Sequence, residues 1–100
     1  MESKTVEKSA VETNIVQQHS YFKHFCIASN RLASYKNWPK HHHPEPEDLT
    51  SAGFIYSGCG DYCWCFNCKL GIKNWSRNDS PSKVHKKYSA DCSYIKLCYA

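Results

Sequence analysis

The feature that most constrains this chain is the spacing of three cysteines and one histidine, Cys65-x2-Cys68-x16-His85-x6-Cys92. A Cys-x2-Cys turn places two thiolates on one side of an ion, and a histidine and a cysteine further along the chain can complete a tetrahedron. Four protein ligands leave no open coordination position, so the spacing predicts one structural zinc ion (Zn2+) without an activated water. The alternative is that Cys65 and Cys68 form a redox pair or are buried thiols.

The composition indicates a small domain in a reducing compartment. One hundred residues suffice for one domain, and a domain of this size often needs a metal ion or disulfides for stability. The seven cysteines are an odd number, which argues against a fully paired disulfide framework. The start of the chain is polar, with no apolar signal segment, and no transmembrane run is visible. We therefore expect a cytoplasmic location and no membrane partner.

The charge of the chain gives no evidence for a specific nucleic-acid partner. Thirteen lysines and arginines stand against nine acidic residues, a formal net charge of +4. This excess favours only weak, non-specific attraction to nucleic acid. The metal-ligand spacings of 16 and 6 residues fit neither a zinc finger nor a zinc knuckle, so specific binding to nucleic acid is not expected.

The chain divides into a polar leader, residues 1–20, which we expect to be flexible, and one domain over residues 21–100. The predicted fold class is α+β, a three-stranded antiparallel sheet surrounded by short helices. The predicted elements are a helix over 30–35 capped by Ser29, a helix from Pro46 to the stop at Gly53, strands over 54–56, 62–66 and 72–75, and a helix starting at Ser80-Pro81. Residues 41–46 form a loop, and its three adjacent histidines are predicted to be solvated rather than to bind a second metal ion.

Side chains alternate between the two faces of the predicted strand over 62–66. Cys63 is therefore expected to be a core residue, with Tyr62 and Trp64 on the opposite face.

The order of the residues around the metal ligands resembles a known family. The pattern is Arg31-x2-Ser34-Tyr35-x2-Trp38-Pro39, then Leu49-x2-Ala52-Gly53-Phe54-x-Tyr56-x-Gly58-x2-Asp61-x3-Cys65-Phe66-x-Cys68, then Trp75-x3-Asp79-x-Pro81-x3-His85-x6-Cys92. It resembles the baculovirus IAP repeat, or BIR domain, of the inhibitor-of-apoptosis family, over a motif core of residues 31–95. The resemblance implies the BIR fold, and Arg31 is expected to be structural, tying loop carbonyls together.

The resemblance also implies a surface groove that takes the free, alanine-first N-terminus of a partner protein as an added β-strand. The implied partners are caspases or pro-apoptotic antagonists of the family. Backbone groups of Gly71, Ile72 and Lys73 are expected to bind the peptide. The implied side-chain contacts are Trp75 as an apolar wall, Asp79 as acceptor of the α-ammonium, Tyr88 against the first peptide residues, and Trp64 as an exposed aromatic beside the groove.

Each of these residues also has a structural explanation. Trp75 is equally typical of a core position, and Asp79 is suited to favouring the start of the next helix. Val84 stands where peptide-binding relatives often have a second polar partner for the ammonium. The alternative function is therefore a BIR-type scaffold that docks an adaptor or self-associates through another surface. An enzyme is not expected, because ubiquitin-ligase activity in the family needs a RING domain and this chain has no second cysteine-histidine cluster.

Overall fold

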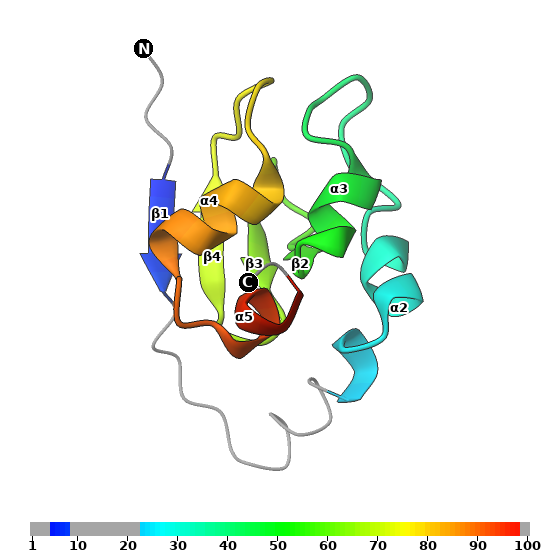
Figure 1. The fold of residues 1–100 in the computed structure, drawn as a ribbon. Coiled ribbons are helices and arrows are strands. Elements are labelled where there is room, and N and C mark those ends of the chain that lie inside the picture. The colour runs from blue at the N-terminus through cyan, green and yellow to red at the C-terminus, as the bar shows by residue number, and fades with distance from the viewer. Residues whose placement is uncertain (1–4, 9–22, 99–100) are drawn as a thin grey trace.

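The computed structural model describes residues 5–8 and 23–98, and every structural statement below refers to these ranges. The chain forms short strands and short helices (Figure 1). In order they are β1 (Thr5–Lys8), α2 (Ala28–Ala33), α3 (Pro46–Ser51), β2 (Phe54–Tyr56), β3 (Cys63–Cys65), β4 (Leu70–Lys73), α4 (Pro81–Tyr88) and α5 (Ser93–Cys98). The predicted α+β class, with short helices around one antiparallel sheet, is confirmed.

The sheet has four strands in the order β1-β4-β3-β2, and all neighbouring strands are antiparallel. The prediction of three strands was wrong by one. The additional strand, β1, lies within the leader of residues 1–20 that was expected to be flexible; the other leader residues lie outside the described ranges. An edge strand leaves a row of backbone N–H and C=O groups unpaired, and β1 pairs that row along β4.

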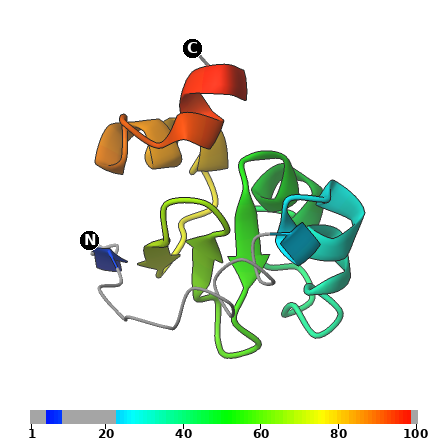
Figure 2. The ribbon, with the colours of Figure 1, turned by 90° about the horizontal axis from the view of Figure 1, so that it is seen from below.

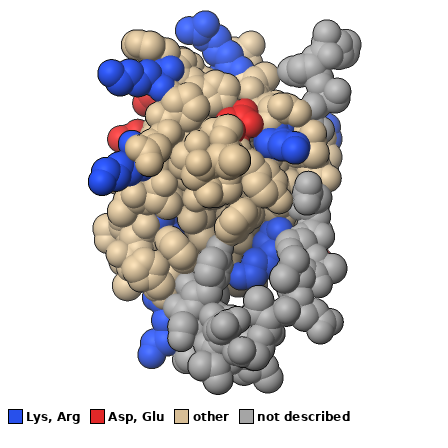
Figure 3. Space-filling model, turned by 180° about the vertical axis from the view of Figure 1, so that it is seen from behind, with Lys and Arg blue, Asp and Glu red and all other residues tan. Residues whose placement is uncertain are grey.

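The helices lie around the sheet in two groups. Figures 1 and 2 show α4 and α5 over one face of the sheet, with α2 and α3 beside β2 at the other end. The side chains between these layers form one buried cluster, which includes Leu49, Phe54, Leu70, Ile72 and Ile95. On the face of the molecule opposite α4 and α5, lysines and arginines are dispersed around a largely uncharged centre (Figure 3). Dispersed charges of this kind attract anions only weakly.

Helix starts that depend on proline were predicted correctly, and one that depends on a serine cap was not. Both α3 and α4 begin at a proline, Pro46 and Pro81, which suits the first helical position because its amide has no partner there. By contrast α2 begins at Ala28, so Ser29 lies in its first turn instead of capping it. The N-cap residue of α2 is Ile27, with no side-chain cap hydrogen bond.

The third predicted strand, 72–75, is shifted in the structure. It occupies Leu70–Lys73 as β4 and ends where Asn74 adopts a left-handed backbone, with φ of 63°. The Asp61 carboxylate accepts hydrogen bonds from the backbone N–H groups of Asn74 and Trp75, each at 2.9 Å. These amides therefore bond to a side chain rather than to a neighbouring strand, and β4 ends before them.

Candidate metal centre and sheet edge

The three predicted cysteine ligands and His85 come together in one cluster. Their ligand atoms all lie within 4.8 Å of one another, although the residues come from β3, the turn after it, α4 and the residue before α5. Two separations fit tetrahedral zinc well. The Cys65 and Cys92 sulfurs are 3.9 Å apart, close to the edge of about 3.8 Å that Zn–S bonds of about 2.3 Å require. Cys68 Sγ lies 3.4 Å from His85 Nε2.

Groups around the cluster orient its ligands. His85 is fully buried, and its Nδ1 donates to the Ala52 carbonyl at 2.7 Å, which leaves the Nε2 lone pair directed at the sulfurs. The backbone N–H groups of Asn67 and Cys68 donate to Cys65 Sγ at 3.3 and 3.4 Å. Donors of this kind stabilise thiolate charge, as a metal-bound cysteine requires.

The pKa values of the three thiols also suit a metal site. Without a cation, hydrogen bonds from Cys65 to the other two sulfurs raise the pKa of Cys65. The same hydrogen bonds lower the pKa of Cys68 to about 3 and that of Cys92 to about 5. The cluster therefore favours two thiolates that share the remaining thiol proton, and a divalent cation can replace that proton.

This donor set fits one structural zinc ion, which Cys65, Cys68, His85 and Cys92 would hold. Three thiolates and one imidazole are typical of closed tetrahedral zinc sites. All four positions are filled by protein, so the ion has no place for water or substrate and its chemistry is to cross-link the fold. In the described residues no other group of cysteines, histidines and carboxylates approaches ligand geometry.

The remaining cysteines form no disulfides. Cys63 is fully buried on β3, as predicted for a core residue, and burial raises its pKa to about 12, so its thiol stays protonated. Cys26, Cys59 and Cys98 are exposed on separate elements. The interpretation of Cys65 and Cys68 as a redox pair has no support in this arrangement, because both sulfurs belong to the four-residue cluster.

The sheet edge predicted to bind a peptide is the outer edge of β4, where Gly71, Ile72 and Lys73 pair with β1. Ile72 is fully buried and faces the core, whereas Lys73 is exposed. A Cβ atom at Gly71 would lie 2.5 Å from the Tyr62 hydroxyl oxygen, so a larger residue there would require the Tyr62 ring to move. Lys73 extends over the same ring, with its Nζ 6.0 Å from the ring centroid. Tyr62 therefore fixes the outward-facing surface of β4.

The other predicted peptide contacts are spread around this edge. Trp64 is half-buried and lies against Tyr62 with ring centroids 5.6 Å apart, on the face opposite Cys63 as predicted. Tyr88, at the end of α4, is 39% exposed. Trp75 is only 5% exposed and packs edge-on against Phe54, so most of its ring belongs to the core. Their roles toward a peptide stay predictions.

Asp79 has a structural contact beside its predicted role. Its Oδ2 accepts the Ser76 N–H at 2.7 Å, which closes the loop between β4 and α4. It therefore holds the loop in addition to any ligand it accepts. Val84 is buried against the core.

Asp61 was present in the sequence pattern, but its function was not recognised there. Its two oxygens accept the N–H groups of Asn74 and Trp75 and contact His42 Nε2 at 3.0 Å. Burial would raise the pKa of Asp61, but these hydrogen bonds outweigh burial and lower it. The signals available in the sequence were its place in the family pattern and its position at the end of the turn that follows β2. Asp61 fixes the turn by which the chain leaves β4.

Replacing Asp61 with alanine is expected to destabilise the domain by about 1.5–3 kcal/mol, because two backbone amides lose a charged acceptor. Asp61→Asn keeps one of the two side-chain oxygens and should lower the free energy of unfolding by less. Urea denaturation of both variants, followed by circular dichroism, measures the difference. A free energy of unfolding for Asp61→Ala within 0.5 kcal/mol of the parent, taken as about the noise of such extrapolations, contradicts the assigned role.

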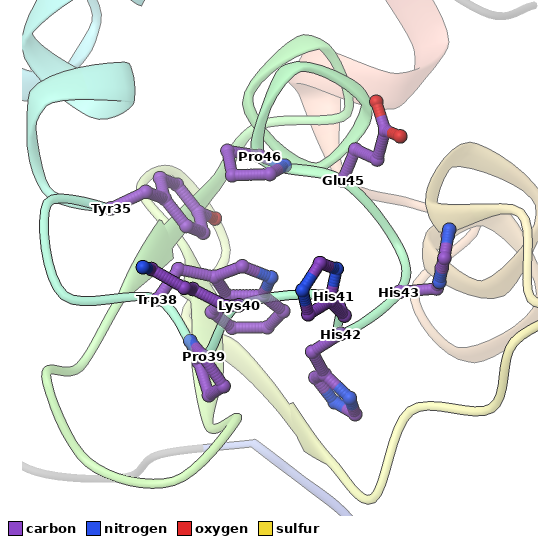
Figure 4. A pocket seen from close by; sticks show the side chains of 9 residues that line it. All are labelled: Tyr35, Trp38, Pro39, Lys40, His41, His42, His43, Glu45 and Pro46. Carbon is purple, nitrogen blue, oxygen red and sulfur yellow. The ribbon is translucent and has the colours of Figure 1, made fainter.

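The three adjacent histidines lie in a loop that borders a shallow hollow (Figure 4). Their imidazoles point in different directions instead of converging on one point. His42 is turned toward Asp61, and its ring lies 5.3 Å from the Trp38 ring. Among the described residues, Cys65, Cys68, His85 and Cys92 form the only group of possible metal ligands found, and the histidine run is not part of it.

Comparison with known proteins agrees with this geometry. Residues 31–96 match the family model described as BIR, the Inhibitor of Apoptosis domain. Apoptosis inhibitor 193R of Invertebrate iridescent virus 6 is 42% identical over 76 residues, which cover 72% of this chain and 36% of the viral protein. The E3 ubiquitin-protein ligase XIAP of Rattus norvegicus is 34% identical over 70% of this chain and 14% of the rat protein. The chain thus corresponds to a minor part of these longer relatives.

Solved structures show the same fold. The autoinhibited BIR1 domain of dIAP1 and the DIAP1 BIR1 domain bound to a Grim peptide each give a TM-score of 0.65 at 25% identity, covering 73% of this chain and 74% of theirs.

No helix in the described part of the chain is long and apolar enough to cross a membrane. The matched family, the shared fold and the cluster of three cysteines and one histidine show that this chain belongs to the BIR family of inhibitor-of-apoptosis domains.

Proposed function

We propose that this chain is a non-enzymatic, cytoplasmic protein-interaction module that binds alanine-first N-termini of caspases or pro-apoptotic antagonists along the outer edge of β4. The observation that carries the proposal is that this edge pairs with an extended segment in antiparallel register over all four of its residues. A BIR domain of similar fold has been solved with a Grim peptide bound. Peptide binding by strand addition uses the same backbone groups.

The surroundings of the edge support a small first residue with a free amine. A buried ammonium needs a carboxylate nearby, since an unpaired charge is costly to desolvate, and Asp79 closes the loop that follows β4. The ring of Trp75 lies at the start of the same loop and, in the proposed complex, limits the space for the first side chain. Gly71 leaves room for the Tyr62 ring close to the β4 backbone.

The central test is a peptide with a free N-terminal alanine, compared with its acetylated form. We expect Asp79→Ala to weaken binding about 10- to 100-fold, because charge-assisted hydrogen bonds contribute roughly 1.5–3 kcal/mol. Asp79→Asn is the matched control for folding, since its amide oxygen can still accept the Ser76 N–H while its charge is gone. Calorimetry should therefore show both variants weakened, and acetylation should weaken the parent at least as much.

The result that contradicts the proposal is equal binding of the free and acetylated peptides, or no binding of either at millimolar concentration. The alternative function, a scaffold that docks an adaptor or associates with itself through another surface, would then take its place. Circular dichroism of the Asp79 variants must match the parent, so that a lost loop contact is not mistaken for a lost ligand contact.

A further inference from the structure

The outer edge of β4 is already paired, within the same chain, by β1. The register aligns Thr5 with Lys73, Val6 with Ile72, Glu7 with Gly71 and Lys8 with Leu70, so every residue of β4 has a partner in β1. The N-terminal end of β1 lies at Lys73, and therefore at the end of the sheet from which the loop to α4 departs (Figure 1). β1 thus occupies the backbone groups that the proposed peptide would need. Its first residue, Thr5, lies at the end of β4 where the loop to α4 begins.

Side chains as well as backbone hold β1 in this register. Directly paired residues of antiparallel strands project to the same face, so Val6 lies on the inner face with Ile72. Val6 is partly buried and packs against the core cluster. Next to it, Asn74 Nδ2 donates to Thr5 Oγ1 at 3.2 Å. A slip of one residue would turn Val6 away from the core, which makes this register specific.

We infer that the chain's own segment Thr5–Lys8 is the resting occupant of the β4 edge, and that a peptide ligand binds only by displacing it. The identity of the competing ligand rests on the proposed function, whereas the pairing of Thr5–Lys8 with β4 does not. β1 differs from the proposed ligand at its first residue. Thr5 follows four residues of chain, so its backbone nitrogen is a peptide amide and carries no ammonium.

Two properties of a competing ligand follow. It must present an apolar side chain opposite Ile72, as Val6 does, because that position faces the core. A ligand whose free ammonium reaches Asp79 makes a contact that the Thr5 amide cannot make. Competition lowers apparent affinity by the fraction of time the edge is free, so an occupancy of about 90–99% corresponds to about a 10- to 100-fold loss.

The pairing of Thr5–Lys8 with the β4 edge is tested first in the full chain without any ligand. Val6→Asp places a charge against the apolar core and should release β1, whereas Val6→Ile keeps the apolar contact and serves as the matched control. Amide hydrogen exchange should then become at least tenfold faster in β4 for Val6→Asp only, while amides of β2 and β3 keep their protection. Unchanged exchange in β4 overturns the inference. Protection that grows with protein concentration also overturns it, since the strand would then come from a second copy.

The competition is tested by calorimetry with the same alanine-first peptide. Val6→Asp should bind it about tenfold or more tightly than the parent, and Val6→Ile should match the parent. Equal affinities for all three, with measurable binding, overturn the inference. If β4 responds to Val6→Asp but no variant binds the peptide, the resting occupant is supported and the proposed function fails, so the two failures are distinguishable.

Discussion

Removal of zinc should unfold the domain completely. The ion joins ligands on β3, the following turn, α4 and the residue before α5, and it therefore ties both C-terminal helices to the sheet. Zinc binding contributes about 10–16 kcal/mol in small structural sites, which is as large as the whole stability of a typical domain, about 5–15 kcal/mol. Without the ion, three thiols and an imidazole would be left together in the interior with little apolar surface to replace their ligation.

Cys92→Ala should have the same effect as chelation, because it leaves three ligands and a gap before α5. The exposed cysteines Cys59 and Cys98 provide matched controls, and alanine at either should leave the fold intact. Elemental analysis is expected to give one zinc per chain, and circular dichroism before and after chelation should show loss of the helical signal. A fold that survives both chelation and Cys92→Ala, or metal analysis without zinc, would show that the cluster is not a structural zinc site.

Arg31→Ala should be the most destabilising substitution outside the metal site. Arg31 is 3% exposed, and its guanidinium donates twice to the Thr50 carbonyl, at 3.1 and 2.9 Å, and once to the Phe25 carbonyl at 2.9 Å. It also lies 4.8 Å from the Phe66 ring centroid and 5.3 Å from that of Tyr94. Arg31 is therefore structural, as predicted, but the Thr50 carbonyl that it binds belongs to α3 and not to a loop.

The expected loss for Arg31→Ala is about 3–6 kcal/mol. Hydrogen bonds from a charged donor contribute about 1.5–3 kcal/mol, and the bonds to two carbonyls are lost together. Arg31→Lys keeps the charge but cannot donate to both carbonyls, so it should recover only part of the loss. Arg77→Ala removes an exposed arginine and serves as the control.

Urea denaturation of the zinc-loaded variants measures these differences. A loss below about 1 kcal/mol for Arg31→Ala, comparable to the loss for Arg77→Ala, would mean that the network does not stabilise the fold. The metal content of each variant must stay at the parent's level, because loss of zinc alone would produce a larger change than the one predicted.

Much of this protein could be predicted from local signals in the sequence. The four zinc ligands follow from their spacing, because coordination requires those side chains at those intervals. The starts of α3 and α4 follow from Pro46 and Pro81, since proline suits a first helical turn wherever it occurs. The assignment of Cys63 to the core follows from the alternation of a strand. Each of these depends on which side chains occur and on their spacing along the chain.

Other features were decided only by the tertiary structure. β1 was missed because Thr5–Lys8 has no apolar periodicity, and its pairing uses backbone groups that every residue has. The end of β4 was misplaced because Asp61, distant in sequence, captures the amides of Asn74 and Trp75. The burial of Trp75 follows from its packing on Phe54. Local side-chain chemistry fixes ligands and helix starts, whereas an edge strand or a captured amide depends on which distant backbone group lies within hydrogen-bond reach.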